Sequence, residues 1–210
     1  MNPRLRLFRG RGRSLAVLAL ACLSGVGVLA GCTSTHDAVD QSGFYAFVSP
    51  GGKTQFFYPV AQRKPLAPLS GDSLTQPGKL IQVADFTNQV VVINLWGSWC
   101  GPCRSEAPDL AQAYNQTKKL GVEFLGLDER DVRSAAADFV HNNQIGYPSI
   151  FDDGGRGMLA LNGFPREAVP STLILDRQHR VAAVYIGQVY AGTLLPMIQQ
   201  IAAESARTPG

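Results

Sequence analysis

Cysteine, histidine and charge are all scarce in this chain. Its 210 residues include four cysteines and three histidines, and only 17% of them are charged. A structural zinc site needs about four ligands, and His36, His141 and His179 show no paired spacing, so we expect no metal. The 45% of hydrophobic residues excludes disorder throughout and suffices for one well-buried globular domain with a tail.

No basic region remains once the amino terminus is set aside. The formal net charge is +3, but five arginines lie within the first thirteen residues, and no acidic residue occurs before residue 32. Subtracting these five charges leaves −2 for the remainder. Nucleic-acid binding requires a basic patch, so we expect no nucleic-acid partner.

The uncharged apolar run of residues 15–30 is too short to cross a bilayer as a helix, which takes roughly 20 residues. Its arginine-rich start and small-residue end are typical of a signal peptide. The run ends in Leu-Ala-Gly-Cys at residues 29–32, which resembles the lipobox of bacterial lipoproteins. We expect a lipoprotein signal peptide over residues 1–31 and a lipid anchor on Cys32. The domain is then extracytoplasmic and held to the bacterial cell membrane; the alternative is an uncleaved signal anchor with an incidental cysteine.

The remaining chain divides by composition. Residues 32–43 are small and polar, which indicates a tether. Two aromatic-rich runs around a Pro-Gly-Gly turn predict a β-hairpin over residues 44–58, and a loop rich in proline and glycine continues to residue 77. The main domain covers residues 78–206.

Strand and helix patterns alternate within residues 78–206. Residues 90–95, VVVINL, are almost continuously apolar, as expected of a strand covered on both faces. Thr193 is a plausible N-cap for the last helix. The pattern predicts an α/β fold with a mixed central sheet flanked by helices. The predicted strands are 80–83, 90–95, 122–127, 148–151, 172–175 and 181–186, and the predicted helices are 102–120, 132–142 and 194–203, with a brief one at 155–161.

Only two cysteines remain in the folded part, Cys100 and Cys103, within WGSWCGPCRSEAP at residues 96–108. Pro102 suits the first position of a helix, which places Cys100 at the helix N-terminus. Free N–H groups and the helix dipole favour a thiolate there. We therefore predict that Cys100 is a nucleophile and that the less exposed Cys103 resolves the mixed disulfide. A bridge across so short a loop contributes little as a staple.

Two other cysteine chemistries do not fit this stretch. Covalent haem attachment needs a histidine directly after the second cysteine, and that residue is Arg104. Peroxiredoxin-type peroxidases carry proline and threonine seven and three residues before their cysteine, where this chain has Ile93 and Gly97. We therefore expect no cofactor beyond the redox-active Cys100–Cys103 pair.

WGSWCGPCRSEAP resembles the active site of the thioredoxin superfamily, including Pro108, five residues after Cys103. Residues 168–172, AVPST, look like that family's cis-proline loop. The resemblance implies a thioredoxin-like fold and a bound peptide that pairs with the backbone of Val169. A strand-edge breaker is the alternative role for Pro170. The implied substrate-binding residues are Trp99, Gly101, Pro102, Val169 and Pro170.

Within that superfamily the chain resembles the TlpA/ResA-like branch of membrane-anchored thiol:disulfide reductases. The approach to the motif is similar, and residues 132–151 match the branch's central insertion. Glu106 falls where the branch places a carboxylate near the cysteines, whereas Asn94 occupies the position of thioredoxin's buried aspartate. We hypothesise that Glu106 is the base that deprotonates Cys103, or tunes both thiols. The alternative is a solvated glutamate that faces away.

The resemblance implies an extracytoplasmic thiol:disulfide oxidoreductase that works mainly as a reductant. The implied substrate is the CxxCH motif of apocytochrome c, in cytochrome c maturation. The implied electron donor is a membrane thiol transporter of the CcdA/DsbD type. Two alternatives stay open: a dithiol oxidase or isomerase of the cell envelope, and a non-catalytic thioredoxin-like binding lipoprotein.

Overall fold

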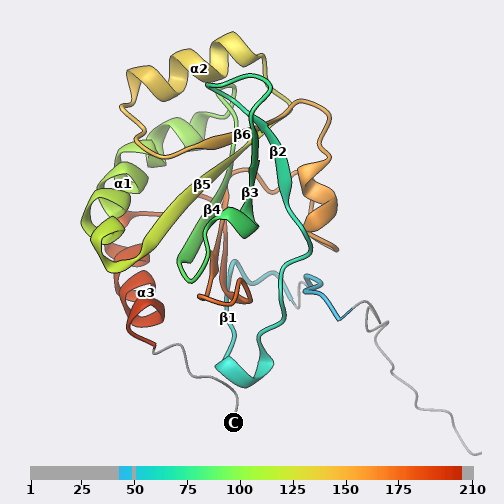
Figure 1. Cartoon of the computed structure of the whole chain (residues 1–210), viewed down its shortest axis with the longest axis vertical. Coiled ribbons are helices and arrows are strands. Elements are labelled where there is room, and N and C mark those ends of the chain that lie inside the picture. Colours follow the sequence, from blue (N-terminus) through green and yellow to red (C-terminus); the bar gives the residue numbers. More distant parts are fainter. Residues whose placement is uncertain (1–42, 49–50, 205–210) are drawn as a thin grey trace, which may run out of the picture. The chain divides into compact units, whose positions relative to one another are not determined.

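An eight-stranded mixed sheet organises the residues that the structure, a computed structural model, describes, which are 43–48 and 51–204 (Figure 1). The strand order is β1-β8-β7-β4-β5-β6-β2-β3. The central strands β4, β5 and β6 are parallel, and every other neighbouring pair is antiparallel. The strands are β1 Gln55–Phe57, β2 Ser70–Ser73, β3 Leu80–Gln82, β4 Val90–Trp96, β5 Val122–Glu129, β6 Ser149–Asp152, β7 Ser171–Leu175 and β8 Val181–Ile186.

Both faces of the central strands are covered. All seven residues of β4 are buried, and successive side chains of a strand point to opposite faces. Val90 and Val92 belong to the cluster that contains Leu110 of α1 and Leu194 of α3. The intervening Val91 and Ile93 belong to the cluster on the other face. The apolar run of β4 is therefore continuous because both faces of the strand are buried, as predicted.

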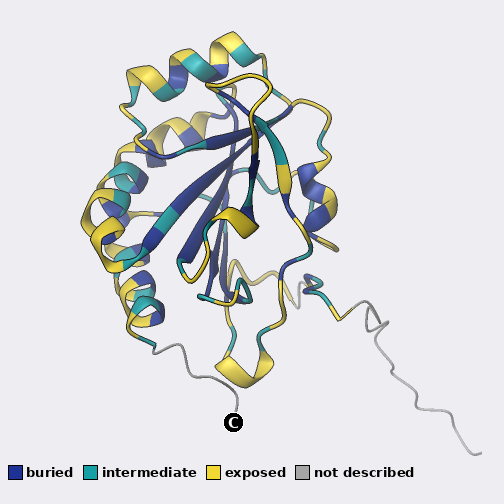
Figure 2. Cartoon of the chain, viewed as in Figure 1, coloured by how far each residue is buried: buried dark blue, intermediate teal, exposed yellow. Residues whose placement is uncertain are grey.

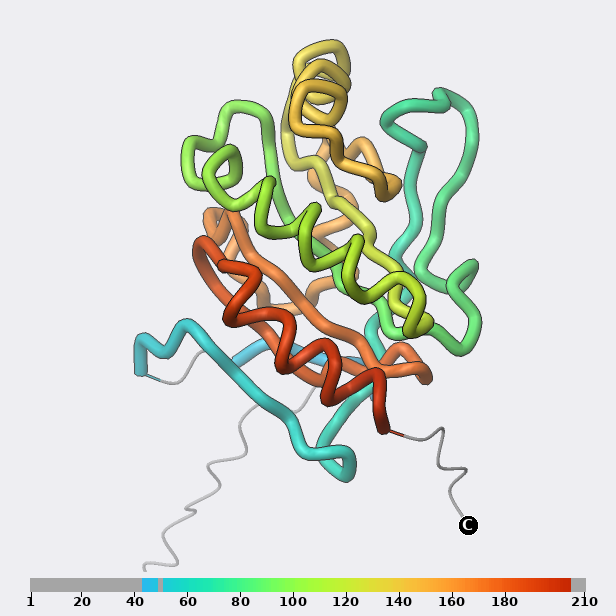
Figure 3. Tube along the Cα trace, turned by 90° about the vertical axis from the view of Figure 1, so that its left-hand side faces the viewer, coloured from blue at the N-terminus to red at the C-terminus, as the bar shows by residue number. Residues whose placement is uncertain are grey.

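Helices α1, Gly101–Thr117, and α3, Ala191–Ala203, lie side by side over one face of the sheet (Figure 3). Helix α2, Arg133–Asn142, connects β5 to β6. The central strands are buried, while the outer surfaces of the helices are exposed (Figure 2). The predicted α/β fold with a mixed, helix-covered sheet is confirmed.

Local signals determine both ends of α1. Cys100 is its N-cap, and Pro102 lies in its first turn, where the missing N–H costs no hydrogen bond. At the other end, one 3₁₀ turn at Lys118–Leu120 leads to Gly121, whose φ of 73° is left-handed. Glycine adopts this conformation without the steric cost that a Cβ imposes, so the predicted helix stop is confirmed.

The predicted N-terminal β-hairpin is wrong. Residues 55–57 form a single strand, β1, which pairs with β8 and not with residues 44–47. Tyr45 instead donates its backbone N–H to Pro65, and Phe47 donates to Asn162. One of the two aromatic-rich runs does contain a strand, but that strand pairs with β8, far away in the sequence.

The predicted connecting loop also contains a strand. Ser70–Ser73 forms β2, which pairs with both β3 and β6. Proline and glycine surround this short strand, and only Ser73 of its four residues is buried, so it carries no apolar alternation. Its partners, not its own sequence, make it a strand.

The closing helix begins earlier than predicted. Helix α3 starts at Ala191 with Tyr190 as its N-cap residue, so Thr193 does not cap it. Asp109 of α1 accepts the backbone N–H of Ala191 at 2.8 Å. A side chain from another helix therefore accepts a free backbone N–H at the start of α3. No local capping pattern in the sequence signals such a partner.

The predicted signal peptide, the Cys32 anchor and the tether lie outside the described residues. Among residues 43–48 and 51–204, no helix has the length and apolar character needed to span a membrane.

Candidate active site

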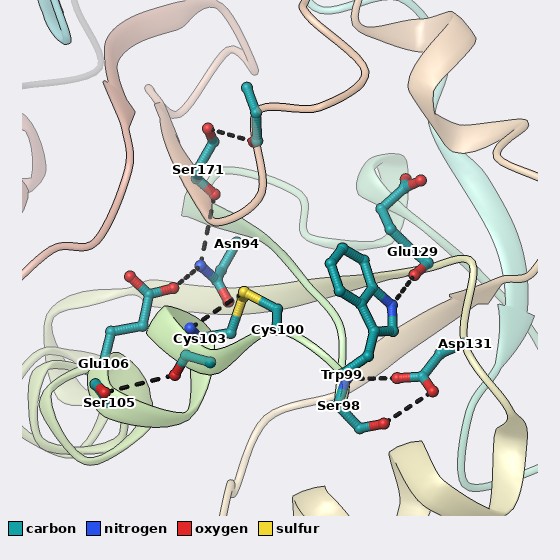
Figure 4. Close-up of a disulfide and its surroundings, with 12 residues drawn as sticks. Asn94, Ser98, Trp99, Cys100, Cys103, Ser105, Glu106, Glu129, Asp131 and Ser171 are labelled. Atoms are coloured by element: carbon teal, nitrogen blue, oxygen red, sulfur yellow. Dashed lines mark hydrogen bonds between the residues drawn. A yellow bond between two sulfur atoms is a disulfide. The ribbon is translucent and has the colours of Figure 1, made fainter.

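Cys100 and Cys103 are joined by a disulfide at the amino-terminal end of α1 (Figure 4). The backbone N–H of Cys103 points at Cys100 Sγ, with an N···S distance of 3.2 Å. This hydrogen bond and the helix dipole would stabilise negative charge on Cys100 once the bridge is reduced. Both cysteines are buried in this oxidised form, with exposed fractions of 4% and 2%.

The loop before Cys100 is held by the last residue of β5 and by the segment that follows it. Asp131 accepts hydrogen bonds from the backbone N–H and the hydroxyl of Ser98. The indole N–H of Trp99 donates to the backbone oxygen of Glu129 at 3.0 Å. Trp99 as a whole residue nevertheless remains 49% exposed. The redox loop is thereby fixed, while an aromatic surface stays open beside it.

Glu106 lies one helical turn after Cys103 and is fully buried. Asn94 of β4 donates its side-chain amide to Glu106 Oε1 at 2.9 Å. The backbone N–H of Val189, in the loop between β8 and α3, donates to Oε2 at 3.0 Å. The solvated, outward-facing alternative for Glu106 is thus wrong.

Burial raises the pKa of Glu106 from 4.5 to about 7. The hydrogen bonds from Val189 and Asn94 lower the pKa, and the charge of Asp109 raises it, but burial dominates. A carboxyl group that titrates near pH 7 is suited to accept and return protons under physiological conditions.

The cis-proline loop lies against the disulfide, as the sequence predicted. The Val169–Pro170 peptide bond is cis, as the resemblance implied. Val169 packs against the buried cluster that contains Cys100, Cys103 and Trp96. Gly187 donates its backbone N–H to the oxygen of Pro170 at 2.9 Å.

The structure brings the predicted site residues together at one end of the sheet. Gly101 and Pro102 are exposed, Val169 is half-buried, and Trp99 is half-exposed. An approaching chain therefore meets Trp99 and the first turn of α1 around an otherwise buried disulfide. The predicted Cys32 anchor lies outside the described residues.

Sequence reasoning missed the acidic end of β5, whose Glu129 backbone oxygen binds Trp99 beside the redox motif. Asp128 and Glu129 are both buried, and burial raises the pKa of each to about 8. Nearby acids add to both shifts, Asp131 for Asp128 and Asp152 for Glu129. The sequence LDERD at the end of an apolar strand is the signal that was available for this cluster.

A sheet of this topology, with a CxxC disulfide at a helix start and a cis-proline loop beside it, defines a member of the thioredoxin superfamily. The chain belongs to the AhpC/TSA family, whose model matches residues 64–184, more than half of its length. The predicted superfamily is confirmed, as is the thioredoxin-like fold class apart from its hairpin.

Several known thiol-disulfide proteins are similar to this chain. "Thiol-disulfide oxidoreductase ResA" of Bacillus thuringiensis subsp. konkukian is 32% identical over 50% of this chain and 58% of its own length. The chain therefore spans less than two thirds of that relative. "Thiol:disulfide interchange protein DsbE" of Vibrio cholerae is 30% identical over 64% of this chain and 72% of its own length. These names agree with the predicted enzyme class.

A solved structure covers more of the chain. A secreted thiol-disulfide isomerase from Corynebacterium glutamicum is 40% identical and has a TM-score of 0.75. The match covers 77% of this chain and 99% of the other.

Proposed function

We propose that the protein is an extracytoplasmic thiol:disulfide oxidoreductase that reduces disulfides in partner proteins. The observation that carries this proposal is the disulfide at the start of α1 with Glu106 buried one turn beyond it. The secreted corynebacterial relative supports the location outside the cytoplasm.

The reaction begins with the reduced protein. The Cys100 thiolate attacks one sulfur of the partner disulfide, and the other partner sulfur leaves as a thiolate. Cys103 then loses its proton to Glu106 and attacks Cys100 Sγ, which releases the second partner sulfur as a thiolate. Two electrons pass from the Cys100–Cys103 dithiol to the partner, and the chain ends with the disulfide seen in the structure.

Glu106 suits the role of the proton acceptor in the second step. Its carboxylate lies on the same helix as Cys103 and is excluded from water. With a pKa near 7, it is about half ionised at neutral pH, so it is available to accept the proton of Cys103 and then return it to solvent or to the released thiolate.

The proposed partner is the CxxCH motif of apocytochrome c, which is reduced before haem is attached. The proposed electron donor is a membrane thiol transporter of the CcdA/DsbD type. The similarity to ResA and DsbE proteins supports this proposal. A lipid anchor on Cys32 would raise the effective concentration of the protein beside such membrane partners.

An isomerase of the cell envelope is the second candidate, because the corynebacterial relative bears that name. Both activities begin with attack by the Cys100 thiolate, so the site geometry serves either. The reduction potential separates them, since about 30 mV changes the two-electron equilibrium tenfold. A potential near that of strong periplasmic oxidants would contradict the reductase proposal.

A trapping experiment tests the proposal directly. Cys103→Ser leaves the mixed disulfide at Cys100 without a resolving thiol, so partners stay covalently bound and can be identified by mass spectrometry. We expect cytochrome c precursors among them. Cys100→Ser is the matched control and should trap nothing. Function preserved in Cys100→Ser would instead support a non-catalytic binding lipoprotein.

A further inference from the structure

Asn94 lies between the buried carboxyl group of Glu106 and the cis-proline loop (Figure 4). Its side-chain nitrogen is 2.9 Å from Glu106 Oε1. The same nitrogen is 3.5 Å from the backbone oxygen of Ser171 and 3.4 Å from Thr172 Oγ1. Ser171 directly follows Pro170, and its hydroxyl donates to the oxygen of Ala168 at 2.7 Å. The Asn94 amide therefore contacts both the Glu106 carboxyl group and the cis-proline loop.

The observed hydrogen bonds suit the ionised form of Glu106. Each of its two oxygens accepts a hydrogen bond, from Asn94 and from Val189. A protonated carboxyl group also carries a donor, which needs an acceptor in this buried place. The backbone N–H of Val189 provides no acceptor.

The Asn94 amide is the partner that can serve both protonation states. It offers a donor nitrogen to the carboxylate, and after a half-turn about its last side-chain bond it offers an acceptor oxygen to the carboxylic acid. The same half-turn takes the nitrogen away from the Ser171 backbone oxygen and Thr172 Oγ1, which it faces in the structure. An aspartate at this position would offer no donor while ionised.

We propose that Asn94 is a positioning residue that couples the protonation of Glu106 to the cis-proline loop. In the ionised state the amide nitrogen holds Glu106. In the protonated state the amide turns, its oxygen takes the place of the nitrogen, and the donor that faces Ser171 and Thr172 at the start of β7 is lost. The inference rests on the proposed function, because it gives a mechanism by which proton uptake during resolution alters the surface that holds the partner.

The other groups around Glu106 do not provide this coupling. Asp109, on the same helix, raises the pKa of Glu106 through its charge. Tyr147, before β6, is buried, and Glu106 contributes to the raised pKa of its hydroxyl. Cys103, also on α1, is the proton donor itself. Among the described residues that hydrogen-bond to Glu106, Asn94 alone also reaches the cis-proline loop.

The test measures the rate at which Cys103 resolves a mixed disulfide with a model peptide, as a function of pH. Asn94→Leu removes the donor that favours the carboxylate, so the acid limb of the profile should move to higher pH by about one unit. Asn94→Asp keeps the size of the side chain but adds a like charge, and should move the limb further. Thr117→Val is the matched control: it removes a buried hydrogen bond elsewhere on α1 and should leave the profile in place.

A double variant shows whether Asn94 acts through Glu106. In a Glu106→Gln background, Asn94→Leu should no longer move the profile. An equal shift with and without Glu106 would overturn the inference, and so would a profile in Asn94→Leu that matches wild type. If Glu106→Gln alone leaves the wild-type profile unchanged, the proposed base is wrong instead.

The coupling to the loop has its own readout. In the wild-type protein, the KM for the peptide disulfide should change across the titration of Glu106. In Asn94→Leu this pH dependence of KM should disappear, although the peptide still binds. A wild-type KM that does not vary with pH would overturn the coupling to the cis-proline loop.

Discussion

The backbone N–H of Val189 donates to Glu106 Oε2 across 83 residues of sequence. This bond ties α1 to the loop that leads into α3, and Asp109 repeats the connection one turn later by accepting the N–H of Ala191. Two carboxyl groups on one helix thus hold the segment between β8 and α3, and one of them is the proposed base.

Burial of Glu106 predicts that stability falls as pH rises. Its folded pKa of about 7 lies above the ordinary value of 4.5, so the folded state holds a proton that the unfolded state releases. This stabilisation is complete below pH 4.5 and is lost as pH rises through about 7, amounting to at most about 3 kcal/mol. Urea unfolding of the oxidised protein across this range measures it. Glu106→Gln should flatten the dependence in this window, and an unchanged slope would contradict the assignment.

Asp131 should control the reactivity of Cys100 through the preceding loop. It accepts from the backbone and hydroxyl of Ser98, and Asp131→Ala leaves these donors without their partner. We expect a loss of about 1–3 kcal/mol in the free energy of unfolding and a changed alkylation rate of reduced Cys100. Asp138→Ala, at an exposed position of α2, is the control. Equal alkylation rates in the two variants would argue against a role for Asp131 in the site.

Gly126 should not tolerate a side chain. A Cβ there would lie 2.2 Å from Ser149 Oγ and 2.6 Å from the indole nitrogen of Trp96. Overpacking of this kind costs about 1–3 kcal/mol, so Gly126→Ala should lower the melting temperature. Gly192→Ala, in α3, meets nothing within 4 Å and should be neutral or stabilising, since alanine favours helix. Equal melting temperatures for the two variants would contradict this packing.

Arg63 should matter for stability and not for redox chemistry. Its side chain is 5% exposed and pairs with Asp176 and Glu204, and its Nε donates to the oxygen of Tyr58. Removing one partner of a buried ion pair costs about 3–5 kcal/mol, so we expect Arg63→Ala to lower the urea midpoint strongly. Lys64→Ala, at the exposed neighbouring position, should have little effect. A changed reduction potential in Arg63→Ala would show that the pair acts beyond stability.

Local patterns predicted the central strands, α1 and its stop at Gly121, because those signals lie within a few residues of what they specify. The same holds for Cys100, whose place at the helix start follows from Pro102 and the preceding strand. Local patterns failed for the hairpin, since an aromatic-rich run beside a turn looks the same in a hairpin arm and in an edge strand. The partner of β1 is β8, more than a hundred residues away.

The sequence by itself therefore determined the redox motif and the class of fold, because cysteine spacing, the helix start and apolar periodicity are properties of neighbouring residues. Only the tertiary structure decided how Glu106 titrates. Its pKa depends on water being excluded by packed elements, and on donors from β4 and from the loop before α3. Those groups meet only when the chain folds, so no local pattern specifies the proton chemistry of this site.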